Sequence, residues 1–226
     1  MNQDYVFSSE TPVGPLPNLF IVADGMGGHQ AGDFASKFTV NTVVQEISEC
    51  GESDPERALR YAIERANAML RERAFEDMSL YGMGTTVVAA CVLEDEKLLV
   101  ANVGDSRLYI VGDTIRQITK DHSLVEEMIR TGGIDRKSAR NHPKKNVITR
   151  AVGAEDAIEV DFFLTEFKEN ELALMCTDGL TNMLEDEEIR MIIAGAPDIV
   201  EKTERLVAAA NENGGRDNIS VILISR

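Results

Sequence analysis

The feature that most constrains this chain is an apolar segment that runs directly into an acidic residue surrounded by glycines. The segment from Leu19 to Ala23 favours a β-strand, and Asp24 follows at once in the sequence Asp-Gly-Met-Gly-Gly. A strand gains nothing in packing from a terminal carboxylate, whereas glycines allow the backbone to approach a ligand closely. The pattern therefore indicates a polar function at Asp24. For the Asp-Gly pair alone, the alternative is a strand that ends in an ordinary turn.

The same arrangement recurs three times further along the chain. Asp105 follows one apolar segment, Asp178 follows the segment 172–177, and Asp217 lies just before the apolar segment 219–224. Strand ends at one edge of a sheet can be brought together by the fold, and converging carboxylates repel one another unless cations lie between them. The sequence therefore predicts that these carboxylates hold a hard divalent metal.

Six short motifs carry a resemblance to a known family, and together they span essentially the whole chain. In order they are Asn2-Gln3-Asp4, Asp24-Gly25-Met26-Gly27-Gly28-His29, Gly82-Met83-Gly84-Thr85-Thr86, Gly104-Asp105-Ser106-Arg107, Thr177-Asp178-Gly179 and Asp217-Asn218. In this order and at this spacing they resemble the motif series of bacterial metal-dependent protein phosphatases, the type 2C or PPM family. Each motif alone is a weak signal, whereas six in family order are specific.

The resemblance implies a fold and an activity. The family fold is α+β, a four-layer α-β-β-α sandwich in which two antiparallel sheets pack face to face and helices cover both outer faces. The implied reaction is metal-dependent hydrolysis of phosphoserine and phosphothreonine in proteins by a metal-bridging hydroxide, without a phosphoenzyme intermediate. Cys176 is not followed by a short anion-binding loop ending in arginine, so the sequence does not indicate a cysteine-dependent phosphatase.

The resemblance also assigns ligands for two Mn²⁺ or Mg²⁺ ions. Asp24 is the candidate bridge between the ions, which lie about 3.5 to 4 Å apart in binuclear sites of this kind. Asp178 and Asp217 complete the shell of the first ion. The carbonyl of Gly25 serves the second ion, and Asp4 holds that ion either directly or through its water.

A third, looser ion is implied at Asp105, which matches the family position that helps to hold it. The alternative is that Asp105 caps the turn in which it lies. The histidines His29, His122 and His142 show no zinc-like spacing, and this favours Mn²⁺ or Mg²⁺ over zinc.

Two positions inside the motifs depart from the family pattern. Glutamate is common in the family where Gln3 stands, so we expect one negative charge fewer and weaker binding of the second ion. Some relatives have histidine where Met26 stands. This leaves either His29 or a metal-bound water as the acid for the leaving group.

The start of the sequence also departs from the family pattern. Family members usually carry a strand and an arginine before the Asn2-Gln3-Asp4 motif, whereas Met1 directly precedes it here. We therefore expect the usual first strand to be lacking, which leaves a neighbouring strand unpaired and favours either edge association or a frayed end around Gln3 and Asp4. Substrate phosphate should then bind more weakly, unless another basic residue such as Arg107 serves it.

Length and composition bound the class of protein. The 226 residues, 43% of them hydrophobic, suit a single phosphatase-like domain over residues 1–226.

The sequence has no apolar run near 18 residues and no signal-peptide pattern, which predicts a cytoplasmic protein without a membrane span. Cys50, Cys91 and Cys176 are expected to be reduced thiols. The net charge of −16 argues against nucleic acid as a partner.

Positive charge is concentrated in one stretch of this acidic chain. Residues 130–150, here called the basic segment, contain Arg130, Arg136, Lys137, Arg140, Lys144, Lys145 and Arg150 against a single acid, Asp135. We expect this segment to belong to a flap, residues 119–150, that meets phosphorylated or acidic protein surfaces. The alternative is a solvated loop.

The order of the expected helices and strands agrees with an α+β fold. Helices are expected from Phe34 to Ile47, from a capping box at Ser53 to Leu70, from Ser123 to Gly132, and at 185–194 and 198–211. Strands are expected at 158–164, 172–176 and 219–224, and as one antiparallel meander at 85–93, 97–103, 107–111 and 114–119. No regular βαβ alternation appears, which disfavours a doubly wound sheet.

Two other function classes stay open. A non-catalytic relative could keep the fold and sense a partner, and failure to hydrolyse p-nitrophenyl phosphate with Mn²⁺ would favour this class. A metal-dependent nucleotide hydrolase is the other class, although the sequence contains no P-loop. For an active phosphatase, the resemblance implies phosphorylated proteins as partners and a serine/threonine kinase as counterpart. A monomer is expected.

Overall fold

Two antiparallel β-sheets form the centre of the structure, a computed structural model that describes residues 2–28 and 31–226. The first sheet contains β1 Asp4–Ser9, β2 Leu19–Met26, β3 Gly84–Thr85, β4 Val87–Val92, β5 Lys97–Val103 and β8 Asp161–Glu166. The second sheet contains β6 Arg107–Val111, β7 Ile115–Gln117, β9 Leu172–Cys176 and β10 Val221–Ser225. The strand order is β1-β2-β4-β5-β8 in the first sheet, where β3 also pairs with β2, and β10-β9-β6-β7 in the second.

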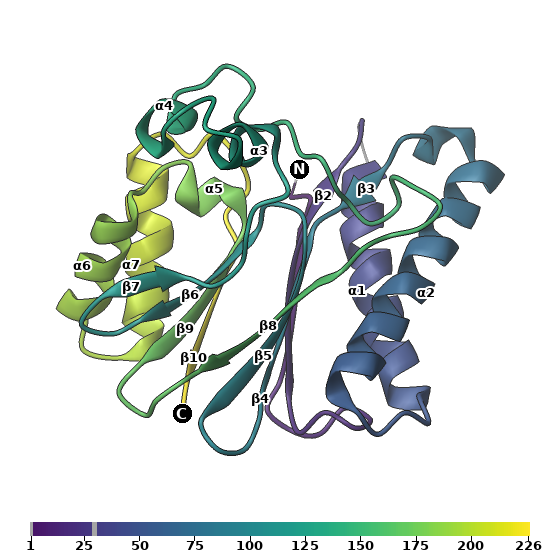
Figure 1. The fold of residues 1–226 in the computed structure, drawn as a ribbon, viewed down its shortest axis with the longest axis horizontal. Helices are drawn as coiled ribbons and strands as arrows, with labels where there is room; N and C mark the ends of the chain where they lie inside the picture. The colour runs from purple at the N-terminus through teal and green to yellow at the C-terminus, as the bar shows by residue number, and fades with distance from the viewer. Residues whose placement is uncertain (1, 29–30) are drawn as a thin grey trace.

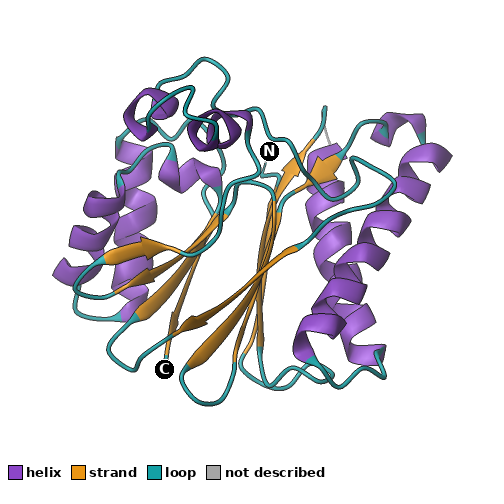
Figure 2. Cartoon of the chain, in the orientation of Figure 1, coloured by secondary structure: helices purple, strands orange, loops and turns teal. Residues whose placement is uncertain are grey.

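Helices cover the outer face of each sheet (Figure 1, Figure 2). The first sheet is covered by α1 Ala31–Glu49 and α2 Pro55–Glu76, and the second by α6 Asp186–Gly195 and α7 Ile199–Glu212. The shorter helices are α3 Leu124–Arg130, α4 Arg136–Arg140, α5 Asp178–Thr181 and the 3₁₀ helix η1 Met78–Leu80. This layer order confirms the expected α+β fold, a four-layer α-β-β-α sandwich.

The central strands are buried on both faces, and this explains their continuous apolar sequences. Successive side chains of a strand point to opposite faces. In β2, Leu19, Ile21 and Ala23 therefore join the core beneath α1 and α2, whereas Phe20 and Val22 join the core between the two sheets. Both sides of the strand exclude water, so the sequence shows a run of apolar residues instead of a simple alternation.

The expected antiparallel meander is divided between the two sheets, so the prediction of one meander was wrong. The pairs β4–β5 and β6–β7 form as expected, but β5 and β6 belong to different sheets. The chain crosses between them at Gly104, which has a φ of +106°, and a Cβ added there would lie 2.5 Å from Cγ2 of Thr86. The alternation of a strand does not indicate which sheet it joins, and for this reason the crossing was missed.

The start of α2 and the structure of the basic segment also differ from the sequence prediction. The N-cap of α2 is Asp54 and not Ser53, because the Asp54 carboxylate accepts a 2.9 Å hydrogen bond from the Arg57 backbone N–H. The basic segment, which showed no periodicity, contains the short helix α4.

The flap region, residues 119–150, is a long excursion that is closed at its base. The backbone N–H of Thr149 donates to the carbonyl of His122 at 2.8 Å, and that of Leu124 donates to the carbonyl of Val147 at 2.8 Å. Between these two contacts lie α3 and α4, which are at the top of Figure 1. The base of the flap region is therefore tied to the sandwich while the basic segment extends above it.

The first residues of the described chain are anchored, contrary to the expected frayed end. In β1, Asp4 pairs with Asp24 of β2. The Gln3 N–H donates to Oδ1 of Asn218 at 2.7 Å, and the Gln3 carbonyl accepts from the Gly25 N–H at 3.1 Å and from the Ser36 hydroxyl at 2.6 Å. Along its other edge, β1 has no strand partner among the described residues.

The helices and the cysteines of the structure bear on two further expectations. Within residues 2–28 and 31–226, no helix has the length and apolar character that crossing a membrane requires. Cys50, Cys91 and Cys176 are free thiols.

Candidate active site

The fold brings the five predicted acidic residues to one end of the sandwich. Asp24 lies near the end of β2, with Asp4 opposite it on β1. Asp178 is the first residue of α5, directly after β9, whereas Asp105 lies in the crossing from β5 to β6 and Asp217 precedes β10. The charges of the other four all act on Asp24. The five carboxylates therefore converge as expected from their positions near strand ends, and both sheets contribute to the group.

Burial and mutual repulsion raise the pKa values of four carboxyl groups of the site, those of Asp4, Asp24, Asp105 and Asp178. Burial is the main cause at Asp24, and with the charges of its acidic neighbours it raises the pKa to about 9. Burial likewise raises the pKa of Asp105 to about 7 and that of Asp4 to about 6, although hydrogen bonds from Ser220 and Thr177 oppose the shift at Asp4. The pKa of Asp178 is raised by burial and by Asp217. Such a group of acids calls for a cation at neutral pH.

Two buried carboxylate oxygens have no hydrogen-bond donor within the described residues. They are Oδ1 of Asp4 and Oδ1 of Asp178. An unpaired buried oxygen of a charged group is costly, and a bound cation would supply the missing partner. Hard divalent ions accept such oxygens, so this donor set fits Mn²⁺ or Mg²⁺.

The carboxylates do not by themselves form a complete coordination shell. No three Asp, Glu, His or Cys side chains of the described chain converge on a single ion position. Backbone carbonyls and water would have to supply the other ligands, as Mg²⁺ commonly requires. At Gly25, next to Asp24, an added Cβ would lie 1.9 Å from the carbonyl oxygen of Gly32, so this position requires glycine.

Thr177 fixes the other oxygen of Asp4. Its hydroxyl donates to Oδ2 of Asp4 at 2.9 Å and accepts from the backbone N–H of Ser220 at 3.0 Å. Asp4 is only 6% exposed, so this hydrogen bond sets the direction of a buried carboxylate. Its free oxygen is the one left for a cation.

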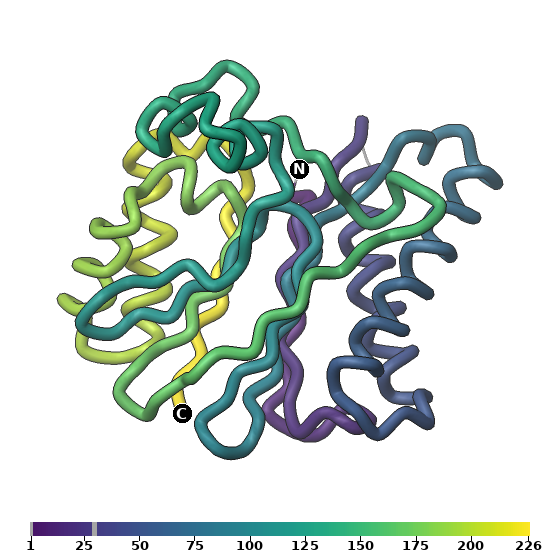
Figure 3. Tube along the Cα trace, viewed as in Figure 1, coloured from purple at the N-terminus to yellow at the C-terminus, as the bar shows by residue number. Residues whose placement is uncertain are grey.

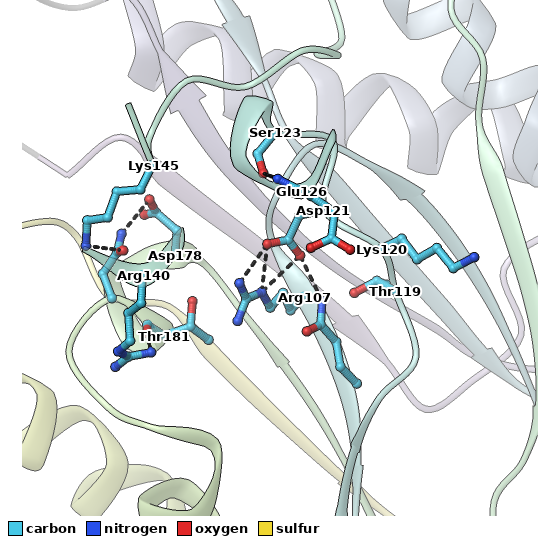
Figure 4. Close-up of polar contacts among 12 residues, drawn as sticks. Arg107, Thr119, Lys120, Asp121, Ser123, Glu126, Arg140, Lys145, Asp178 and Thr181 are labelled. Carbon is cyan, nitrogen blue, oxygen red and sulfur yellow. Dashed lines mark hydrogen bonds and ion pairs between the residues drawn. The ribbon is translucent and has the colours of Figure 1, made fainter. Parts of the chain in front are cut away.

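Asn182 fixes Asp178 in the same way and connects it to the basic segment. Its side-chain N–H donates to Oδ2 of Asp178 at 2.8 Å, and its carbonyl oxygen accepts from Nζ of Lys145 at 2.8 Å. Figure 4 shows Lys145, Arg140 and Thr181 on the same side of the site as Asp178. Arg140 donates to the carbonyl of Thr181 at 3.1 Å. The basic segment therefore lies directly against α5.

His122 holds the turn that carries Asp105. Its Nδ1 accepts from the backbone N–H of Gly104 at 3.0 Å, and its own backbone N–H donates to the Gly104 carbonyl at 2.9 Å. On the other side of the ring, Nε2 lies 3.2 Å from Oδ2 of Asp161. His122 thus holds the turn in a position where the charge of Asp178 helps to raise the pKa of Asp105.

Arg107 is engaged inside the protein and is a poor candidate for a phosphate-binding residue. Its Nε and Nη2 donate to the carboxylate of Asp121, with Nη2 2.7 Å from Oδ2 (Figure 4). Its Nη1 donates to the Tyr109 hydroxyl at 2.8 Å. Binding a substrate phosphate would require these contacts to break, so the geometry does not support that alternative.

Sequence reasoning found the acidic residues but missed the side chains that orient them. Asn182 lies four residues after Asp178, a spacing that places two side chains on one face of a helix, so a signal was available. Nothing local to the sequence connects Thr177 with Asp4 or Lys145 with Asn182, because these pairs are far apart along the chain. His29, the candidate acid for the leaving group, lies outside the described residues.

Comparison with known proteins decides the family. The model of the protein phosphatase 2C family matches residues 1–223 of this chain. The chain belongs to the protein phosphatase 2C family. The resemblance carried by the six motifs is thereby confirmed.

Individual members of the phosphatase 2C family agree with this assignment. A serine/threonine phosphatase Stp of Listeria welshimeri is 43% identical over 213 residues, which are 92% of this chain and 84% of that protein. The crystal structure of the serine/threonine phosphatase Stp1 from Staphylococcus aureus matches with a TM-score of 0.92 at 33% identity, covering 100% of this chain and 89% of that one. The catalytic domain of the phosphatase PstP, solved in complex with two manganese ions, matches with a TM-score of 0.84 at 29% identity, covering 99% and 90%.

Proposed function

We propose that this protein is a metal-dependent serine/threonine protein phosphatase, which hydrolyses phosphoserine and phosphothreonine in protein substrates. The observation that carries the proposal is the convergence of Asp4, Asp24, Asp105, Asp178 and Asp217 at one end of the sandwich, where burial raises the pKa of the first four and two buried carboxylate oxygens are unpaired. Membership of the phosphatase 2C family supports it.

The residues of the site suit a pair of Mn²⁺ or Mg²⁺ ions. Asp24, Asp178 and Asp217 would hold the first ion, in part through water, and Asp24, Asp4 and the Gly25 carbonyl would hold the second. When bound, such ions stabilise charge on phosphoryl oxygens and lower the pKa of water, which allows direct attack on phosphorus. The two manganese ions of the PstP structure support this count. A third, looser ion would be held in part by Asp105.

The protein's own contribution is to orient these carboxylates before substrate arrives. Thr177 directs one oxygen of Asp4 away from the site, and Asn182 does the same for Asp178. The remaining oxygens are held ready in a partly buried position, where electrostatic contacts are stronger than in water. Because Gln3 stands where glutamate is common in the family, we expect the second ion to be the weaker of the two.

The basic segment is proposed to meet the phosphorylated or acidic surface of the substrate protein. It lies against α5 through Lys145 and Arg140, so a substrate bound at the carboxylates would pass beneath it. Lys144 is exposed beside Lys145 and is available to such a surface. This supports the flap interpretation over a freely solvated loop.

A metal-dependent assay tests the proposed function. With Mn²⁺ present, the protein should hydrolyse p-nitrophenyl phosphate and peptides that contain phosphoserine or phosphothreonine, and a chelator should abolish turnover. Phosphotyrosine peptides are the specificity control. If no phosphate is released from any of these substrates at saturating Mn²⁺, the alternative of a non-catalytic relative that binds a partner would replace this proposal. The cytoplasmic location, the monomeric state and the kinase counterpart stay predictions.

A further inference from the structure

A cavity of about 670 Å³ lies beside the candidate active site. Its walls are the C-terminal end of α2, the connection from Tyr81 to Gly84, and the segment 148–159. Figure 3 shows this last segment, in green, passing beside the upper end of α2. Met26 also lines the cavity and directly follows Gly25, so the cavity begins where the proposed site of the second ion ends. We call this cavity the apolar groove.

Small side chains, or none, occur at several of the positions that line the apolar groove. They are Gly82, Gly84, Ala151, Gly153, Ala154 and Ala157. The aromatic side chains of Phe75 and Tyr81 also line it and are 72% and 71% exposed, so both are open to a partner. A hollow lined by small residues and bordered by exposed aromatic side chains fits an apolar side chain that enters from outside.

The groove is held in shape by hydrogen bonds that do not depend on a ligand. Thr85 and Val152 exchange backbone hydrogen bonds of 3.0 and 2.9 Å, which joins the segment 148–159 to β3. The side-chain oxygen of Asn67 accepts from the Gly153 N–H at 2.7 Å. Arg71 donates to the carbonyl of Ala154 at 3.0 Å. Binding would therefore cost little ordering of the chain.

The charges around the groove do not suit a second anion. Arg71 is paired with Asp156, and Arg150 is paired with Glu159 and Asp161. Both guanidinium groups are thus neutralised by neighbouring carboxylates, and neither is left to bind a phosphate or an acidic side chain. The features that remain for recognition are the small apolar residues of the lining and the exposed aromatic side chains of Phe75 and Tyr81.

We propose that the apolar groove binds an apolar or aromatic side chain of the protein substrate, close in sequence to the phosphoserine or phosphothreonine that is hydrolysed. The inference rests on the proposed function, because Met26 lines the groove and directly follows Asp24 and Gly25, where the phosphate would be hydrolysed. An extended peptide advances about 3.3 Å per residue, so residues near the phosphorylated one come to lie over the groove. The groove then selects among phosphorylated sequences, whereas the carboxylates act on the phosphate common to all.

The test uses phosphothreonine peptides that differ at one flanking position, with phenylalanine, leucine, serine or aspartate placed at each position in turn. The intact protein should prefer phenylalanine or leucine at one position by roughly tenfold in kcat/KM, the range typical of one hydrophobic pocket. Ala157→Trp, which fills the groove, and Tyr81→Ser, which removes one of its exposed aromatic side chains, should each abolish the preference. Neither should change turnover of p-nitrophenyl phosphate, which has no flanking residue.

Matched control variants separate the groove from general surface effects. Ala208→Trp on α7 adds the same side chain at another exposed alanine, and Met191→Ser on α6 removes another exposed apolar side chain. Both should keep the preference. Hydrolysis of every peptide at equal rates, or a preference that survives both groove variants, would refute the groove while leaving the proposed phosphatase activity in place. The groove proposal would also be refuted if the protein self-associated and Tyr81→Ser abolished that association. The occupant of the groove would then be a second copy of the chain.

Discussion

The hydroxyl of Thr177 donates a hydrogen bond of 2.9 Å to the carboxylate of Asp4, a residue 173 positions away in the sequence. Asp4 belongs to the first sheet, whereas Thr177 directly follows β9 of the second. The same hydroxyl accepts from the backbone of Ser220, just before β10. One side chain therefore joins the two sheets at the point where the proposed metal ligands converge, so the packing of the sandwich and the geometry of the site depend on each other.

Replacing Thr177 by valine should lower the free energy of unfolding. The change keeps the shape of the side chain but leaves the buried Asp4 carboxylate and the Ser220 N–H without their partner, at a cost of about 1 to 3 kcal/mol. Thr177→Ser keeps the hydroxyl and is the matched control. Urea unfolding of the metal-free proteins measures both variants. Equal stability of Thr177→Val and the unchanged protein would show that Asp4 finds another donor.

Asp24→Asn, Asp178→Asn and Asp217→Asn should each abolish divalent-dependent turnover, because each removes a charge that the ions require. The fold should survive. For Asp24 the metal-free protein should even unfold at a higher temperature, since the variant removes a carboxyl group whose charged form is disfavoured by burial and by its acidic neighbours. Activity toward p-nitrophenyl phosphate and thermal unfolding in chelator measure the two effects. If any of the three variants turned over substrate at a near-normal rate at low Mn²⁺, the assignment of two ions would be contradicted.

Asp105→Asn should behave differently from the three variants above. A looser third ion assists turnover but does not build the pair, so this variant should bind two ions tightly and hydrolyse slowly. Isothermal titration calorimetry with Mn²⁺ counts the tight sites. Loss of a tight site would instead make Asp105 a ligand of the main pair.

The metal-free protein should become less stable as the pH rises. The pKa of Asp24 is raised from 3.8 to about 9, that of Asp105 to about 7 and that of Asp4 to about 6. The folded state therefore retains protons that the unfolded state releases above about pH 4, and the free energy of unfolding falls as the pH passes through these raised values. Saturating Mn²⁺ should oppose the fall, because the ions replace the protons. Urea unfolding between about pH 5 and pH 9, with and without Mn²⁺, tests this sign. A metal-free stability that rises over this range would contradict it.

The sequence indicated the site more completely than it indicated the path of the chain. Asp24, Asp105, Asp178 and Asp217 were found because a carboxylate at the end of an apolar segment is locally out of place, and a local signal needs no knowledge of the fold. The crossing at Gly104 was missed because β5 and β6 have the same alternation whether they share a sheet or not. The contact of Thr177 with Asp4 was missed for a related reason, since it exists only after the two sheets have packed.

The last prediction separates two neighbouring lysines of the basic segment. Lys145 donates to Asn182, which in turn donates to Asp178, and the positive charge of Lys145 partly offsets the burial that raises the pKa of Asp178. Lys145→Met should therefore loosen a metal ligand and raise the Mn²⁺ concentration needed for half-maximal turnover, on the order of tenfold for one lost charge-assisted hydrogen bond. This effect should be equal for p-nitrophenyl phosphate and for phosphopeptides.

Lys144→Met is the matched control, because Lys144 is exposed and its side chain has no partner among the described contacts. It should leave the Mn²⁺ requirement unchanged and raise KM for phosphopeptides alone, since p-nitrophenyl phosphate does not reach the basic segment. Titration of Mn²⁺ with both substrates distinguishes the two variants. If both variants changed only the KM for phosphopeptides, the basic segment would act on substrate alone. The contact through Asn182 would then have no part in holding Asp178.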